Sequence, residues 1–177
     1  SFTSSGTFTN QGTFTKSIGT GTTTSSVASF SNTGTVNASS GTLALNSTTL
    51  TQHSGTTLTG GTWNVTNGAA ITRTAGSNIT TIGSAATVLL DGAGSSFAKV
   101  TTALNNNQGS FTIKNDRDLT TAGAYTNSGT TRVESSTIID QTVMTIGAGG
   151  SAAYTQTGGE TVLVGGALID ASVFNLN

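Results

Sequence analysis

This 177-residue chain contains no cysteine and no proline, and each absence excludes a class of structure. Without cysteine the chain can form neither disulfide bonds nor cysteine-ligated zinc sites. Proline lacks a backbone N–H and is excluded from central strands, so its absence favours near-continuous strand pairing. The sequence also has no apolar run near the roughly 20 residues that a membrane-spanning helix needs, and we therefore expect no membrane insertion.

Charge is equally scarce, because only 7% of the residues are charged and the formal net charge is −1. A typical globular domain has about 25% charged residues. Six basic residues spread along the chain do not make the basic patch that a nucleic acid needs, so the sequence excludes a DNA or RNA partner. All seven acidic residues follow position 90. In a fold whose repeats stack in register, like charges at equivalent positions would repel one another. The scarcity of charge fits such a fold.

The chain is built instead from a short phrase that alternates polar and apolar residues. Gly-Thr-Phe-Thr occurs at residues 6–9 and 12–15, and variants return at 34–36, 61–65 and 109–113. Successive side chains of a strand point to opposite faces, so each copy predicts a short strand with its apolar residue inward and its threonines outward. Thr, Ser, Gly, Val and Asn are poor to middling helix formers. The chain is therefore predicted to be nearly all β.

The turns between these strands recur with a longer period along the sequence. Asn-x-Gly turns place glycine at positions 12, 34, 109 and 129, so the turns within each pair are 22 and 20 residues apart. A fixed period in this range indicates a repeat architecture, and the strands are shorter than those of sandwiches and barrels. We predict one all-β domain over residues 1–177. Its fold is a single-stranded parallel β-helix (β-solenoid) with about 20–22 residues per coil and roughly eight coils.

Two later segments share a more specific pattern. Tyr125-Thr-Asn-Ser-Gly129 is echoed by Tyr154-Thr-Gln-Thr-Gly158, and each precedes a strand that contains valine. This succession resembles the repeats of bacterial surface proteins, such as autotransporter passengers and filamentous-haemagglutinin-like adhesins. The resemblance implies a right-handed β-helix outside the cell, used for adhesion, matrix building or display. It implies no catalytic residues and no cofactor.

The densest charged segment is Lys114-Asn-Asp-Arg-Asp118, and it is the one place where catalysis deserves consideration. Glycoside hydrolysis needs two carboxyl groups about 5–9.5 Å apart, and Asp116 and Asp118 share a face if the chain is extended. A turn between coils, with aspartates bonding local backbone, is the favoured interpretation. His53 has no partner in the sequence and is interpreted as a turn residue. We therefore predict no catalytic, cofactor-binding or metal-binding residues, and no cofactor.

Threonine pairs raise a further alternative, because an ordered array of hydroxyl groups on a flat face can bind ice. The candidate pairs are Thr7/Thr9, Thr13/Thr15, Thr20/Thr22 and Thr57/Thr59. The first two pairs are six residues apart, which places them on different strands of one coil rather than on one face. Trp63 and the seven phenylalanines are expected to fill the interior.

These patterns favour a non-enzymatic extracellular protein, a surface stalk or the subunit of a fibre. The chain starts directly in Ser1-Phe2-Thr3 and closes in an alternating segment at 171–177, so we expect uncapped coil ends that self-associate end to end or meet neighbouring solenoid domains. Surface glycans are a second partner class. The alternatives are a polysaccharide-binding or polysaccharide-cleaving module and, less favoured, an ice-binding protein.

Overall fold

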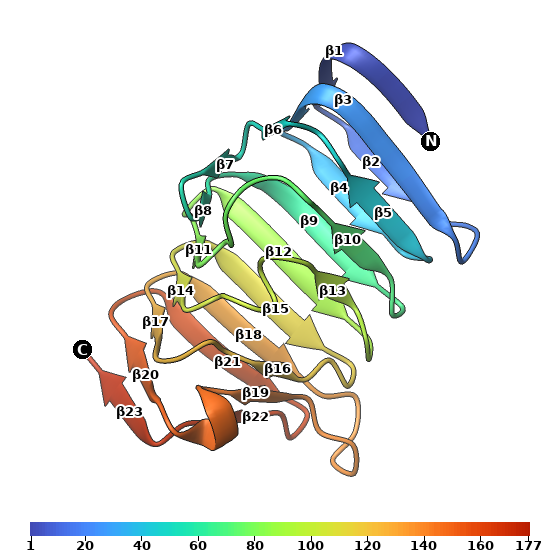
Figure 1. Cartoon of the computed structure of the whole chain (residues 1–177). Helices are drawn as coiled ribbons and strands as arrows, with labels where there is room; N and C mark the ends of the chain where they lie inside the picture. Colours follow the sequence, from blue (N-terminus) through green and yellow to red (C-terminus); the bar gives the residue numbers. More distant parts are fainter.

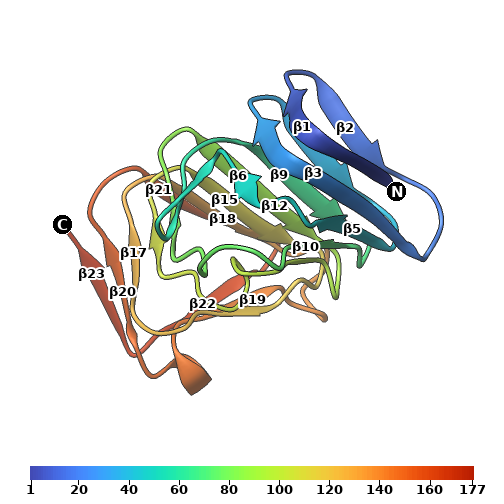
Figure 2. The same ribbon diagram turned by 45° about the horizontal axis from the view of Figure 1, so that its top comes forward.

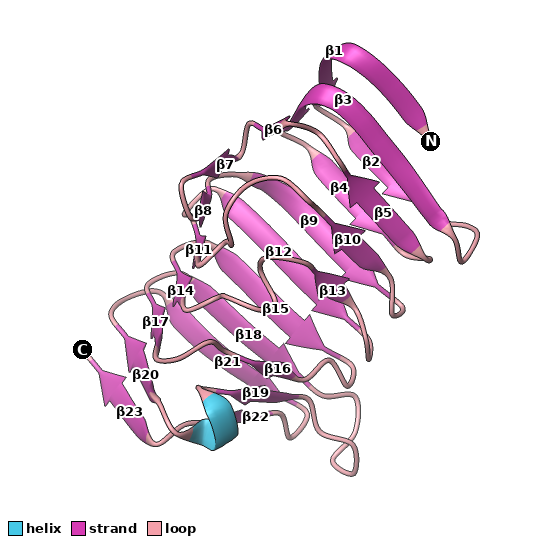
Figure 3. Cartoon of the chain, viewed as in Figure 1, coloured by secondary structure: helices cyan, strands magenta, loops and turns pink.

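A computed structural model describes residues 1–177 and shows an all-β solenoid of parallel strands with about 8 turns (Figure 1). The predicted fold class is confirmed. Each winding takes about 23 residues, slightly more than the 20–22 expected. The only helical element is a short 3₁₀ turn, η1 (Ala148–Gly150), and the rest is strand and loop (Figure 3).

Three walls enclose the core. Sheet B forms the longest wall and contains β2 (Thr13–Lys16), β4 (Thr35–Ala38), β9 (Gly61–Thr66), β12 (Ala86–Asp91), β15 (Ser110–Lys114), β18 (Thr130–Glu134) and β21 (Glu160–Val164). Sheet C contains β7 (His53–Ser54), β8 (Thr57–Leu58), β11 (Thr81–Ile82), β14 (Asn106–Asn107), β17 (Tyr125–Asn127), β20 (Ala153–Gln156) and β23 (Val173–Leu176).

The third wall is shared by two sheets. Sheet A holds β1 (Phe2–Asn10), β3 (Thr22–Asn32), β5 (Thr42–Leu45), β10 (Ala70–Thr72) and β13 (Ser96–Phe97), with β6 (Thr49–Leu50) beside β3. Sheet D follows in later windings with β16 (Leu119–Thr120), β19 (Val143–Thr145) and β22 (Leu168–Asp170). All strand pairs are parallel except β7 with β8, which form an antiparallel pair. From β9 onward the chain visits sheet B, sheet A or D, and sheet C in turn, whereas β1 to β6 lie only in sheets A and B.

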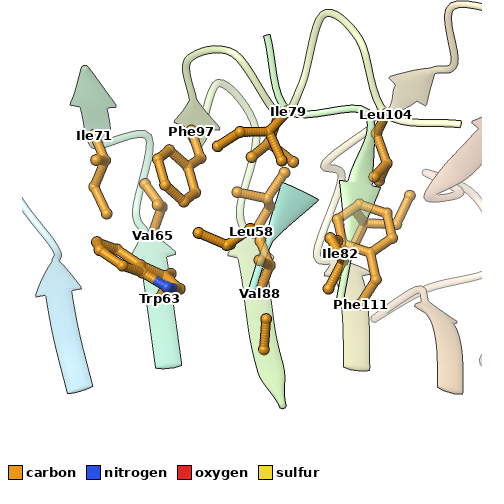
Figure 4. Packing of buried hydrophobic residues seen from close by; sticks show 14 of the residues in the cluster. Leu58, Trp63, Val65, Ile71, Ile79, Ile82, Val88, Phe97, Leu104 and Phe111 are labelled. Carbon is orange, nitrogen blue, oxygen red and sulfur yellow. The ribbon is translucent and has the colours of Figure 1, made fainter. Parts of the chain in front are cut away.

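The alternation of polar and apolar residues determines which side chains form the core, because every second residue of a sheet B strand points inward. Val36, Trp63, Val88 and Phe111 occupy one register position on successive strands and are fully buried. Figure 4 shows the last three side by side, with Phe97 of sheet A packed against Trp63 at a ring distance of 5.4 Å. One cluster of 29 buried residues runs through the solenoid.

The Asn-x-Gly turns form buried amide ladders. Asn107 Nδ2 donates to Asn127 Oδ1 at 2.9 Å and to the Thr130 carbonyl at 2.8 Å. One winding later, Asn127 Nδ2 donates to Gln156 Oε1 at 3.0 Å and to the Glu160 carbonyl at 2.8 Å. A shorter ladder joins Asn10 and Asn32 near the N-terminal end, where the amide groups bond at 2.8 Å. Each asparagine side chain thus donates a hydrogen bond to the backbone of the next winding.

Close stacking requires the glycines of the later turns at Gly34, Gly109 and Gly129, whereas a Cβ on Gly12 in the first winding would meet nothing within 4 Å. A Cβ atom on Gly129 would lie 2.1 Å from the Gly109 carbonyl oxygen, well inside contact distance. The turns therefore approach one another as backbone against backbone, and the periodic glycines of the sequence mark these contacts.

Replacing Gly129 with alanine should destabilise the protein by about 1–3 kcal/mol, because the new methyl group forces neighbouring turns apart. Gly123→Ala is the matched control, since a Cβ there meets nothing within 4 Å. Urea unfolding followed by circular dichroism measures both. Equal stability of the two variants would contradict close turn stacking.

Asn127→Leu should also cost about 1–3 kcal/mol, although Leu58 and Ile82 occupy the same register column in earlier windings. The substitution removes the donor to the Glu160 carbonyl and one of the hydrogen bonds that Gln156 Oε1 accepts. Asn78→Leu, at an exposed position, is the control in the same unfolding experiment. A variant at Asn127 as stable as the control would show that the ladder contributes nothing.

Candidate functional surfaces

The last winding, which contains β21, β22 and β23, lies at the C-terminal end of the solenoid (Figure 2) and exposes apolar residues. Leu163 pairs in register with buried Val133, and Phe174 pairs with buried Tyr154, yet each of these two outer residues is 50% exposed. Leu176, in the same strand as Phe174, is 78% exposed. Leu163, Phe174 and Leu176 define this end face. Their side chains continue the columns of the core and are exposed there.

The opposite end face is aromatic. Phe2, Phe8 and Phe14 pack on one another with ring distances of 5.3–5.8 Å, and Phe8 and Phe14 rest on buried Phe30. Phe2 and Phe14 also line a cavity of about 240 Å³. The expectation that every phenylalanine lies in the interior therefore holds for Phe30, Phe97 and Phe111, whereas those of the two end windings are partly exposed.

The outer face of sheet B carries one column of hydroxyl groups. In register on six successive strands lie Thr13, Thr35, Thr62, Thr87, Ser110 and Thr130. The neighbouring outward column is mixed, because it includes the bonded pair Asn37 and Asn64, then Leu89 and, farther along, Arg132. The face thus holds a single rank of hydroxyls beside amide, apolar and charged groups.

The threonine pairs singled out in the sequence do not meet. Thr7 and Thr9 belong to β1 of sheet A, whereas Thr13 and Thr15 belong to β2 of sheet B. Thr57 lies in β8 of sheet C. The sequence reasoning missed the register column on sheet B, because its members are separated by unequal stretches of chain.

The charged segment at 114–118 forms the turn that the sequence predicts. Asn115 and Asp116 adopt positive φ angles of 53° and 64° between β15 and β16. Asp118 Oδ1 accepts a 2.7 Å hydrogen bond from the Val143 backbone N–H in the next winding. Lys114 forms an ion pair with Asp91 at 3.4 Å. The turn is therefore confirmed, but the expected bonds from these aspartates to local backbone are not: Asp118 bonds the next winding, and Asp116 Oδ1 is buried without a hydrogen-bond partner.

The two tyrosines of the shared motif stack on each other. Their rings lie 5.5 Å apart, and Phe174 continues the column at 5.4 Å from Tyr154. The Tyr125 hydroxyl is 2.9 Å from Thr131 Oγ1, and desolvation by burial raises the pKa of Tyr125 far above its ordinary value. The motif therefore builds a neutral, hydrogen-bonded aromatic column in the core.

His53 lies in a cluster that the sequence did not reveal. Its ring Nδ1 is 3.0 Å from Arg73 Nη1, and its Nε2 is 3.4 Å from Ser77 Oγ. Burial, followed by the positive charges of Arg73 and Lys99, lowers the pKa of His53 below 6.5. The interpretation of His53 as a turn residue without a partner is therefore wrong, because His53 lies in β7 and stacking brings residues from the next two windings against it.

No group of three or more His, Cys, Asp and Glu residues is arranged to hold a metal ion. The structure contains no helix with the length and hydropathy needed to cross a membrane. No protein-family model, curated protein or solved structure matches the chain.

The free energy of unfolding should fall as the pH drops from 7.5 to 5. The unfolded chain binds a proton at His53 more readily than the folded protein, because the folded pKa lies below 6.5, so protonation favours unfolding. Urea unfolding at both pH values measures the effect, and His53→Gln should flatten this part of the dependence. An identical fall in the variant would contradict the assignment.

Proposed function

We propose that this protein is a non-enzymatic extracellular structural or adhesive rod, a surface stalk or fibre subunit, whose end faces bind further solenoid windings. The observation that carries the proposal is the exposure of Leu163, Phe174 and Leu176 at positions where earlier windings bury their side chains. A second copy of this chain is the partner to which we commit. Its aromatic end face offers the complementary surface.

The physical argument combines apolar burial with strand pairing. Fully burying one large apolar side chain stabilises an interface by roughly 1.5–3 kcal/mol. The outer edges of β21, β22 and β23 also present backbone groups that can continue the parallel ladder. A copy that places its β2 on β21 extends sheet B, and each addition leaves a new open end. Such a head-to-tail contact does not close, and it generates a filament.

Other observations support the proposed extracellular location and adhesive role. The Tyr-Thr-x-x-Gly repeats at Tyr125 and Tyr154 resemble those of bacterial surface proteins. The absence of cysteine and the low charge are compatible with that setting. The stacking of Tyr125 on Tyr154 shows that the motif contributes to core packing. A motif with this role favours a structural protein.

A polysaccharide-binding module is the second candidate, and the outer face of sheet B favours it. The hydroxyl column from Thr13 to Thr130 and the bonded amides of Asn37 and Asn64 present a polar strip along the rod. Binding of neutral glycan oligosaccharides that Asn64→Ala weakens would support this candidate. Binding unchanged by Asn64→Ala would remove it.

A charged residue at the end face should block self-association. The double variant Leu163→Lys/Phe174→Lys places two like charges on exposed inward positions, so a second winding can no longer cover them. We expect the unmodified chain to form larger species as its concentration rises, and the variant to stay monomeric in sedimentation velocity and negative-stain microscopy.

Leu89→Lys is the control, because Leu89 points outward from the middle of sheet B and should leave association unchanged. Circular dichroism confirms that each variant is folded. An unmodified chain that remains monomeric at all concentrations would overturn the proposed contact between copies.

A further inference from the structure

Three windings bring basic side chains to one corner of the solenoid. His53 lies in β7, Arg73 follows β10, and Lys99 follows β13 (Figure 1). Arg73 Nη1 donates to His53 Nδ1 at 3.0 Å, so the imidazole accepts this bond in its neutral form. Lys99 Nζ donates to the Gly76 carbonyl at 2.7 Å, within the loop that follows Arg73. The contacts make these residues one cluster.

The loop backbone is shaped to hold the cluster together. Gly76 has a φ of 81°, and a Cβ there would lie 2.9 Å from His53 Nδ1, so only glycine lets the loop pack against the ring. Lys99 adopts a φ of 75°, which is an unusual conformation for a residue with a side chain. Ser77 adds a hydroxyl group beside His53 Nε2.

Arg73 is a buried cation without an acidic partner. Its residue is only 7% exposed, and its Nε–H has no hydrogen-bond acceptor. The two ion pairs of the protein lie elsewhere, at Lys114–Asp91 and Arg132–Glu134. Buried charges in proteins are normally paired or bound to a ligand, and an unsatisfied charged donor is costly.

The chemistry of the missing partner follows from the guanidinium group. The bond to His53 uses Nη1, and Nε is enclosed by protein atoms, so Nη2 is the guanidinium donor that remains for an oxyanion. Lys99 supplies a second positive charge, whereas the Ser77 hydroxyl already donates to the Gly55 carbonyl. His53 and Ser77 lie on a partly open surface, so a ligand can approach from solvent.

We propose that Arg73 and Lys99, with His53 as the residue that positions the guanidinium, form a binding site for a sulfate or phosphate group. The group is either a free ion or a substituent of an acidic polysaccharide. This inference stands independently of the proposed contact between end faces.

The single histidine of the chain provides the assay. The His53 ring Cε1–H resonance is followed by proton NMR while sodium sulfate or phosphate is added, with sodium chloride at equal ionic strength as reference. We expect a saturable shift with the oxyanions alone and a rise in the His53 pKa, because a bound anion favours the imidazolium. Equal shifts with chloride would overturn the site.

Variants locate the binding. Arg73→Gln should abolish the saturable shift, and Lys99→Gln should weaken it about tenfold through loss of a charge-assisted bond. Lys99→Gln keeps the test decisive if the buried Arg73 variant fails to fold. Arg132→Gln removes a charge that Glu134 already pairs, so it is the matched control and should leave affinity unchanged. Equal affinity in all folded variants would refute the proposal.

A final comparison identifies the source of the group. Sulfated dextran oligosaccharides that bind more tightly than free sulfate, with neutral dextran inactive, would assign a polysaccharide ligand. Affinity no higher than that of free sulfate would assign the free oxyanion. Both outcomes uphold the site, whereas failure of every sulfated or phosphorylated probe to bind would overturn it.

Discussion

The structure depends on one constraint, that the backbone of each winding bonds to the windings above and below in parallel register. Thr130 N–H donates to the Gly109 carbonyl at 2.8 Å, and Glu160 N–H repeats the bond to Gly129 one winding on. Because register is kept, equivalent residues lie on top of one another. Buried asparagines therefore bond along the rod, and glycines remain where turns touch. In one outward column, Asp91, Lys114 and Glu134, opposite charges alternate along the rod.

The same constraint leaves two kinds of surface with different uses. Inner strands of the side walls pair with a neighbour on each side, so the chemistry of the walls comes from outward side chains such as the hydroxyl column of sheet B. End faces combine free strand edges with exposed core residues, and they favour contact with more windings. Corners belong to neither class. Loops from successive windings meet there, and the cluster of His53, Arg73 and Lys99 shows how residues far apart in the sequence can build a polar site.

Much of the fold could be predicted from the sequence, because the repeated phrase and the Asn-x-Gly turns record the stacking directly. The period was less regular than expected, since Thr35 pairs with Thr62 and Thr130 pairs with Glu160. Loops that contain β7, or that follow β18, lengthen a winding without changing its register. The His53 cluster could not be predicted for the same reason. Its members come from loops of unequal length, and only the stacked structure brings them together.

Nuclear Overhauser contacts between backbone protons test the central claim most directly. In-register parallel stacking predicts contacts that join Val88 to Phe111 and Ile113 to Val133, with the amide-to-Hα pattern of parallel neighbours. Strong Hα–Hα contacts between neighbouring strands of sheet B would show antiparallel pairing instead. That result would contradict the solenoid, and with it the account of the ladders, the end faces and the corner site.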